Sequence, residues 1–95
     1  MKYCLEFTTK ADRMLAKYFK NNPALAKIFQ SAFENLIEDQ FSPTLRTHKV
    51  FSKSFGMAYS SRVTGDLRII WNYKHNQIVI LIYTVGSHSG KKAVY

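Results

Sequence analysis

The sequence predicts a single α+β domain in which two helices pack on one face of a small antiparallel sheet. Two observations predict this fold. Hydrophobic residues recur at helical spacing up to about residue 40, and from Leu45 onward they alternate with a period of two. The chain has 95 residues, of which 46% are hydrophobic, enough for one modest core. We therefore expect residues 1–95 to form one domain with the element order β-α-α-β-β-β-β.

The first strand is predicted at residues 2–7, where hydrophobic side chains alternate with Cys4 and Glu6. Cys4 lies among hydrophobic neighbours, so we expect a buried thiol and not a nucleophile. It is the single cysteine, which excludes a disulfide within the chain and is typical of a reducing cytoplasm. No signal peptide is recognisable, and the longest hydrophobic run, residues 78–83, is too short to cross a bilayer. These features predict a cytoplasmic protein with no membrane partner.

Two helices are predicted between residues 8 and 40. The first follows a threonine cap at position 8 or 9. The second begins at Asn22-Pro23, because asparagine caps a helix N-terminus and proline suits the first helical position. Hydrophobic residues recur every three or four positions from Leu25 to Ile37, so this helix should run to about residue 40. We expect its hydrophobic face to belong to the core.

Four strands are predicted in the C-terminal half, at residues 49–55, 57–63, 67–73 and 77–85. The last is almost entirely hydrophobic and is therefore expected to be a central strand. The turn at residues 64–66 sets the register of the hairpin before it. A three-residue loop pairs Val63 with Leu67 on the core face, and so places Arg62 opposite Arg68 on the other face.

The predicted arginine pair has two interpretations. Because like charges directly across a strand pair are unfavourable, the side chains either splay into water or flank an anion. Arginine's fork geometry suits phosphate, and Asp66 is the single acid among residues 41–95, which favours the anion. These residues also hold eight Lys/Arg and so carry +7 of the formal charge of +8. This charge indicates a polyanionic partner, either nucleic acid or an acidic protein segment, although plain solubility would also explain it.

Two segments resemble the RelE/ParE toxin superfamily. Residues 59–71, with the sequence YSSRVTGDLRIIW, resemble its central hairpin, and residues 86–89, GSHS, resemble the tail signature of its YafQ-like branch. The order of elements and the size are similar over essentially the whole chain. The resemblance implies a RelE-like microbial RNase fold. It also implies the toxin of a type II toxin–antitoxin system that cleaves mRNA in the ribosomal A site, with an antitoxin that wraps the toxin.

The resemblance further implies catalytic residues. His88 matches the tail histidine that YafQ-like members use in catalysis, and Asp66 matches their hairpin aspartate. Arg62 stands where RelE-like members have a catalytic arginine and YafQ-like members a histidine. Tyr95 ends the chain as a tyrosine ends RelE-like tails, although its spacing from His88 departs from the YafQ-like pattern. His48 lies near a histidine that YafQ-like members carry before the hairpin.

The chemistry of RNA cleavage without metal needs these residue types. The 2′-hydroxyl attacks the adjacent phosphorus, so the reaction needs a base, an acid for the leaving 5′-oxygen and cations for the phosphorane. Histidine serves either proton role, and arginine suits the phosphorane. The three histidines and Asp66 lack the spacing of metal ligands, so we predict no metal and no cofactor. The basic residues predicted to bind RNA are Arg68, Lys49, Lys53, Lys91 and Lys92.

Two other functions remain compatible with the sequence. One is a ParE-like toxin, which the resemblance includes and which binds DNA gyrase without cleaving RNA. The other is a basic nucleic-acid-binding module without catalysis, which has no need of His88. A histidine in the tail and nearby acid–base groups favour the endoribonuclease.

Overall fold

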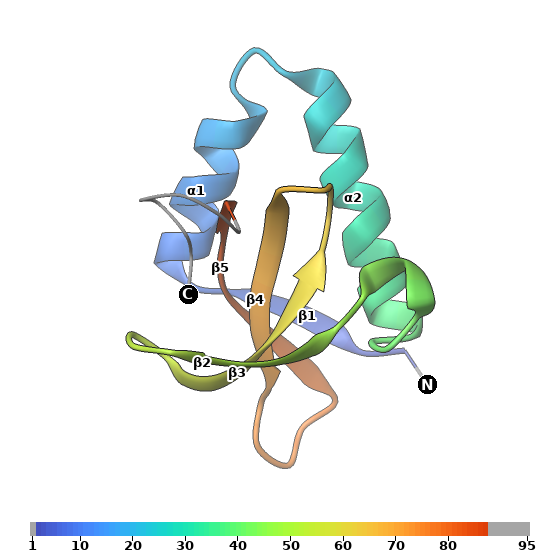
Figure 1. Cartoon of the computed structure of the whole chain (residues 1–95), viewed down its shortest axis with the longest axis vertical. Coiled ribbons are helices and arrows are strands. Elements are labelled where there is room, and N and C mark those ends of the chain that lie inside the picture. Colours follow the sequence, from blue (N-terminus) through green and yellow to red (C-terminus); the bar gives the residue numbers. More distant parts are fainter. Residues whose placement is uncertain (1, 88–95) are drawn as a thin grey trace.

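The structure is a computed structural model, and it describes residues 2–87 (Figure 1). No helix among these residues is both long enough and apolar enough to cross a membrane. The elements, in chain order, are β1 (Cys4–Phe7), α1 (Thr9–Phe19), α2 (Pro23–Glu38), the short 3-10 helix η1 (Pro43–Leu45), β2 (His48–Ser52), β3 (Gly56–Arg62), β4 (Leu67–Tyr73) and β5 (Val79–Ser87).

The five strands form one sheet in the order β1-β5-β4-β3-β2. Neighbours from β2 to β5 are antiparallel, as expected for strands joined by short turns. β1 pairs in parallel with β5, so the sheet is mixed. Most of the chain separates β1 from β5, and no hairpin imposes an antiparallel direction on them. The predicted order β-α-α-β-β-β-β is confirmed, and β5 is a central strand.

Both helices begin at the predicted caps. The Thr8 hydroxyl accepts a hydrogen bond from the Ala11 amide at 3.0 Å, and the Asn22 side chain accepts one from Leu25 at 3.1 Å. Thr8 also donates to the Tyr83 carbonyl at 2.6 Å, which fixes the start of α1 against β5. The capping residues therefore position α1 on the sheet as well as starting it.

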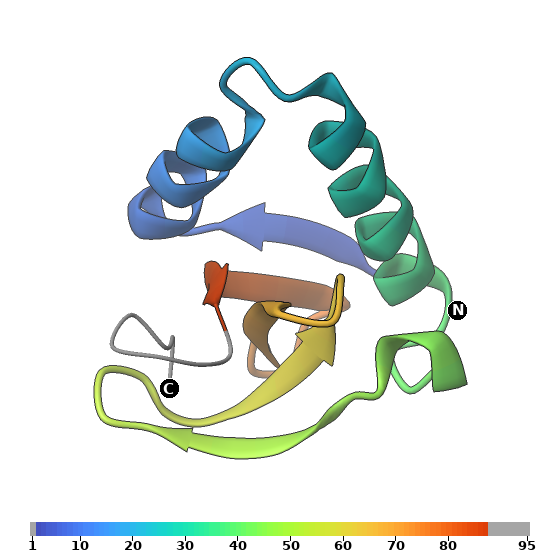
Figure 2. The ribbon, with the colours of Figure 1, turned by 45° about the horizontal axis from the view of Figure 1, so that its top comes forward.

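The core lies between the helices and one face of the sheet. Figure 2 shows both helices on the same side, splaying apart from the loop that joins them, while the β2–β3 ribbon curls away on the other side. This arrangement confirms the predicted packing of both helices on one face. The buried core residues are Ala11, Leu15, Phe29, Ala32, Leu36, Leu45, Ile69, Trp71, Ile80, Ile82 and Val85.

A chain of hydrogen bonds joins the core to the end of α2. The Trp71 indole donates to Ser61 Oγ at 2.8 Å, and the Ser61 and Thr47 hydroxyls lie 2.6 Å apart. Thr47 Oγ1 donates to the Gln40 carbonyl at 2.6 Å, so Ser61 is the donor to Thr47. Trp71 is thus fully buried with its one polar atom satisfied, and the segment before β2 is fixed to β3.

The prediction of a buried Cys4 is wrong, because its thiol is exposed. Side chains alternate along β1, so Tyr3 and Leu5 pack against the core while Cys4 and Glu6 point to the opposite face. β1 is an edge strand, and at this edge the opposite face is not covered. The hydrophobic neighbours of Cys4 belong to the other face.

Replacing Leu36 by alanine should destabilise the domain by about 2–5 kcal/mol, because Leu36 is fully buried between α2 and the sheet. Ile28 on the same helix is 43% exposed. Ile28→Ala is therefore the matched control, with an expected loss within about 1 kcal/mol. Urea unfolding of the two variants checks the difference, and equal losses would contradict the placement of α2.

Candidate functional site

The face of the sheet that points away from the helices, called here the far face, brings together predicted site residues. In the register of the sheet, His48 pairs with Ser60, Ser60 with Ile70, and Arg62 with Arg68. Residues paired across strands share a face, and so do residues two apart along a strand. His48 and Arg62 therefore both lie on the far face, because His48 is paired with Ser60 and Arg62 is two residues further along β3. Trp71 and its neighbours in the core lie on the other face.

The β3–β4 hairpin has the predicted register, with Arg62 directly opposite Arg68. The structure separates the roles open to these two residues. Arg68 turns back onto its own hairpin, where Nη1 donates to the Thr64 carbonyl at 2.7 Å and the Leu67 carbonyl at 3.1 Å. The Arg62 side chain makes no hydrogen bond or ion pair within residues 2–87. One guanidinium of the pair therefore binds the turn, whereas the other has no partner among the described residues.

Arg68→Ala should lower the free energy of unfolding by about 1 kcal/mol, because the hairpin loses hydrogen bonds from a charged donor. Arg62→Ala removes the same charge without a hydrogen bond, so its effect on stability should stay within about 0.5 kcal/mol. Thermal unfolding of both variants tests this. A larger loss in Arg62→Ala would show that Arg62 is the structural member of the pair.

His48 has one ring nitrogen fixed by the backbone. Its Nδ1 lies 3.0 Å from the carbonyl oxygen of Arg46, and since a carbonyl only accepts, Nδ1 is the donor. In the neutral ring this tautomer leaves the lone pair on Nε2. The side chain is exposed, so Nε2 is open to a substrate on the far face.

The floor of the far face is buried and contains an unsatisfied hydroxyl. Ser60, between His48 and Ile70, has no exposed area, and its Oγ has no hydrogen-bond partner within the described part of the chain. Beside it, a bulge in the β4–β5 pairing leaves Tyr83 without a partner residue and brings Thr84 opposite Ile70. Bulges and unsatisfied buried polar groups both recur near functional sites. Nothing in the sequence pattern distinguishes Ser60 or the bulge.

Asp66 lies at the tip of the hairpin and is bound by the end of β5. The Ser87 hydroxyl lies 2.9 and 3.0 Å from the two carboxylate oxygens of Asp66. Burial raises the pKa of the Tyr18 hydroxyl, and the nearby Asp66 carboxylate raises this pKa further. The chain therefore leaves β5 beside Asp66. His88, Lys91, Lys92 and Tyr95, all predicted from the sequence, lie outside the described residues.

The two remaining basic residues are not next to Arg62. Lys49 pairs with Tyr59, whose ring stacks on Trp71, so Lys49 belongs to the helix-side face at the β2 edge. Lys53 is exposed in the turn between β2 and β3. Either residue could contact a long polyanion, but neither is placed to hold the same phosphate as Arg62.

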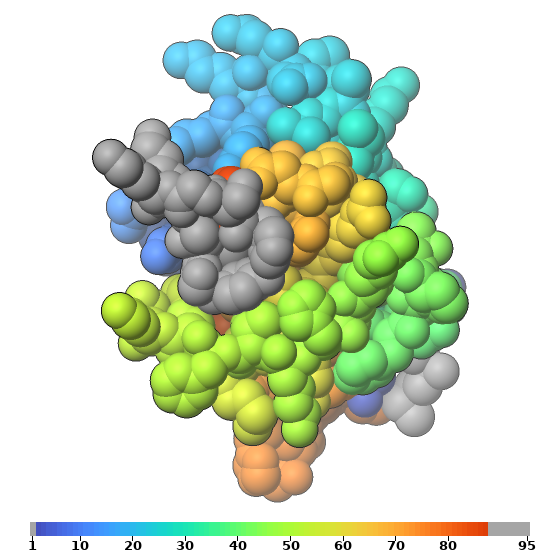
Figure 3. All heavy atoms as spheres, in the orientation of Figure 1, coloured from blue at the N-terminus to red at the C-terminus, as the bar shows by residue number. Residues whose placement is uncertain are grey.

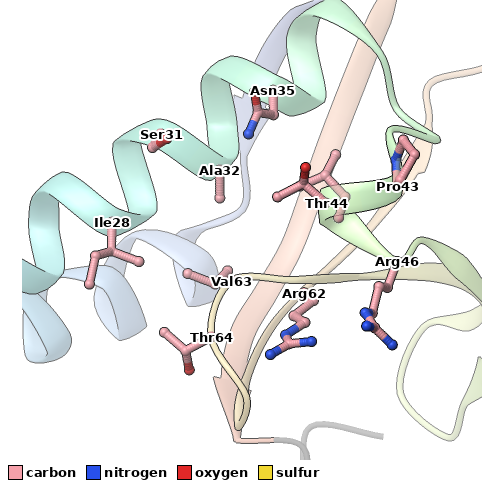
Figure 4. A pocket seen from close by; sticks show the side chains of 11 residues that line it. Ile28, Ser31, Ala32, Asn35, Pro43, Thr44, Arg46, Arg62, Val63 and Thr64 are labelled. Carbon is pink, nitrogen blue, oxygen red and sulfur yellow. The ribbon is translucent and has the colours of Figure 1, made fainter.

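A groove of about 600 Å³ runs from Arg62 to α2 and contains a cation that the sequence prediction missed. Its walls are α2, η1 and the start of the β3–β4 turn (Figure 4). Figure 3 shows the same three segments gathered on one face of the molecule. Arg46 lies at its edge beside Arg62, in a left-handed backbone conformation with φ of 47°. The sequence signal that could have pointed to it is the arginine directly after the Pro43–Leu45 turn.

Among residues 2–87, no group of three or more His, Cys, Asp or Glu side chains lies close enough together to hold a metal ion. The prediction that cleavage needs no metal remains a prediction. No family model and no curated protein matches the sequence.

Solved structures show the same fold. A metal-bound toxin from Helicobacter pylori matches with a TM-score of 0.73 and 22% identity, over 90% of this chain and 94% of that one. RelE in the archaeal RelE–RelB complex of Pyrococcus horikoshii gives 0.71 and 19%, over 94% and 98%. The YoeB–YefM complex of Staphylococcus aureus gives 0.71 and 14%, over 94% and 100%. The chain has the fold of the RelE and YoeB toxins.

Within this RelE/YoeB fold, the site residues other than the lysines that lie among residues 2–87 fall into two groups. His48 and Arg62 share the far face, and Arg46 joins them through the carbonyl that holds His48. Arg68 and Asp66 occupy the hairpin tip and bind the turn and β5. The fold thus supplies one open site with a histidine and two arginines.

Proposed function

We propose that this chain is the toxin of a type II toxin–antitoxin system, a metal-independent endoribonuclease of the YafQ-like branch that cleaves mRNA in the ribosomal A site, in the cytoplasm. The observation that carries the proposal is that an oriented histidine, His48, shares one face of a RelE/YoeB fold with Arg62, whose side chain has no partner among residues 2–87. These two residues supply the base and the cation that attack on a phosphodiester needs, and the acid is assigned separately below.

His48 is the general base in this proposal. Because its Nδ1–H is donated to the Arg46 carbonyl, Nε2 carries the lone pair that removes the proton from the 2′-hydroxyl. The backbone contact holds the neutral ring in this tautomer until Nε2 takes the proton, after which both ring nitrogens carry one.

Arg62 stabilises the phosphorane. The attacking 2′-oxygen adds to phosphorus, and the negative charge that builds on the equatorial oxygens needs a nearby fixed cation. Arg62 shares the far face with His48, so one phosphate can contact both. Its planar fork presents two N–H groups to two phosphate oxygens.

His88 is the general acid that protonates the leaving 5′-oxygen. It follows directly on Ser87, which binds Asp66 at the end of β5. Asp66 is thus available to orient the segment that carries the acid, and we assign it this positioning role. Tyr95 is a further candidate to stack on a base or lend its phenol.

An antitoxin is the second partner. Residues 41–95 carry most of the positive charge, so a partner segment with acidic residues would bind there and would bind less tightly as salt screens the field. The RelE and YoeB proteins that this fold matches were solved with RelB and YefM. The ribosome and mRNA are the targets of the free toxin.

Two assays of the purified chain test the function. In a cell-free translation system we expect reporter synthesis to stop and the reporter mRNA to be cut. In a supercoiling assay with DNA gyrase we expect no inhibition. Inhibition of gyrase with intact mRNA would instead indicate the ParE-like activity. No effect in either assay would contradict a toxin function of either kind.

A further inference from the structure

The groove beside Arg62 is lined by polar side chains that have no role in the proposed chemistry. Besides its two arginines, four neutral polar side chains line it, from α2, η1 and the β3–β4 turn: Ser31, Asn35, Thr44 and Thr64. Within the described residues, the side chains of Ser31, Asn35 and Thr44 make no hydrogen bond. Its apolar lining includes Ala32, Leu45 and Val63. A cavity of about 600 Å³ lies in the range of small-ligand pockets, which is about 300–1,000 Å³.

The two arginines lie at one end of this groove. Figure 4 shows the Arg46 and Arg62 side chains extending in the same direction, away from α2, so that both guanidinium groups stand at its outer mouth. No acidic residue is among the groove's lining residues. A ligand that fits therefore has an anionic end at the mouth and a flat or apolar body with polar edges toward α2.

We propose that this groove binds the base of an RNA nucleotide next to the cleaved phosphate, with Arg46 holding that nucleotide's phosphate at the mouth. The assignment rests on the proposed function. It gives the groove a role in sequence preference, because the Asn35 amide and the hydroxyls of Ser31 and Thr44 present donors and acceptors to a base edge.

Continuity with the reaction site favours RNA over a protein segment. Arg62 belongs both to the far face with His48 and to the groove lining, so a strand of RNA held at Arg62 delivers its next nucleotide to the groove. That second contact is intramolecular and has no new association cost. A protein segment would have to reach the groove independently.

Cleavage mapping tests the assignment. The parent and the variants Asn35→Ala, Thr44→Val and Arg46→Ala are compared on ribosomes programmed with messages that carry each of the four bases on either side of the cut. We expect the parent to prefer one base at one flanking position and Asn35→Ala to reduce that preference about tenfold. Arg46→Ala should slow cleavage of all messages by a similar factor. Lys27→Ala, which removes a charge from α2 outside the groove, should match the parent.

A second measurement reads the groove without cleavage. Titration of the chain with each of the four ribonucleoside 5′-monophosphates should shift the backbone amide signals of Ser31, Asn35 and Arg46 in a base-dependent way. A parent that does not cleave mRNA defeats the proposed function, whereas absent or base-independent shifts defeat the groove assignment. An unchanged base preference in both Asn35→Ala and Thr44→Val also overturns it. So does an Asn35→Ala toxin that cleaves like the parent but escapes its antitoxin, because the groove then holds a protein segment.

Discussion

Arg62→Ala should slow single-turnover cleavage on programmed ribosomes by about 10²–10³-fold, the usual effect of removing one donor that stabilises transition-state charge. The reason is that Arg62 shares the far face with His48 and its side chain has no partner within the described part of the chain. In the proposed mechanism, removing it takes away the cation assigned to the phosphorane. Arg62→Lys should recover only part of the rate, since lysine keeps the charge but lacks the planar fork.

Arg68→Ala is the matched control for this effect. Its guanidinium binds the carbonyls of Thr64 and Leu67, so its loss should reduce stability more than the rate at a temperature where the variant is folded. Equal rate losses in Arg62→Ala and Arg68→Ala would point to a clamp formed by both arginines. Full activity in the double variant would eliminate any role for the pair in phosphate binding.

His88→Ala should slow cleavage by about 10²–10⁴-fold without unfolding the domain, because a general acid contributes a factor of that size. His88→Gln should not restore the rate, since glutamine forms hydrogen bonds but cannot give up a proton. Loss of the acid should also remove the fall in rate on the alkaline side of the pH profile.

The competing role for His88 is RNA binding alone. In that case His88→Ala would weaken binding and leave the single-turnover rate at saturating ribosome unchanged, with the parent's pH profile. Such a result would remove His88 from the chemistry and make Asp66, Arg62 and Tyr95 the remaining candidates. A wholly non-catalytic RNA-binding module would show no cleavage to lose in any variant.

The sequence predicted the fold because its local patterns were unambiguous. The change of hydrophobic period after α2, the caps at Thr8 and Asn22 and the three-residue turn each correspond to one structure. The turn even fixed the register that places Arg62 opposite Arg68. The hydrophobic pattern did not predict the exposure of Cys4, because that depends on which edge of the sheet is covered. It also did not predict the parallel pairing of β1 with β5, because these strands are far apart in the chain.

The candidate site was only partly predictable for a related reason. The resemblance to the RelE/ParE superfamily pointed to Arg62, His48 and Asp66, but not to what each one touches. That Arg68 binds its own turn depends on side-chain conformation. Arg46 sits in no periodic element, and its place beside Arg62 follows from how η1 packs between α2 and the sheet.

We propose that mRNA on the ribosome is cleaved when its own 2′-hydroxyl attacks the adjacent phosphorus. One altered nucleotide tests this mechanism directly. Ribosomes are programmed with two messages that differ only by a 2′-deoxy sugar at the mapped cut position, and each is mixed with excess purified toxin. We expect rapid cleavage of the all-ribose message, which leaves a 2′,3′-cyclic phosphate and a 5′-hydroxyl, and no cleavage at the deoxy position. Equal cleavage of both messages, or none of either, would contradict it.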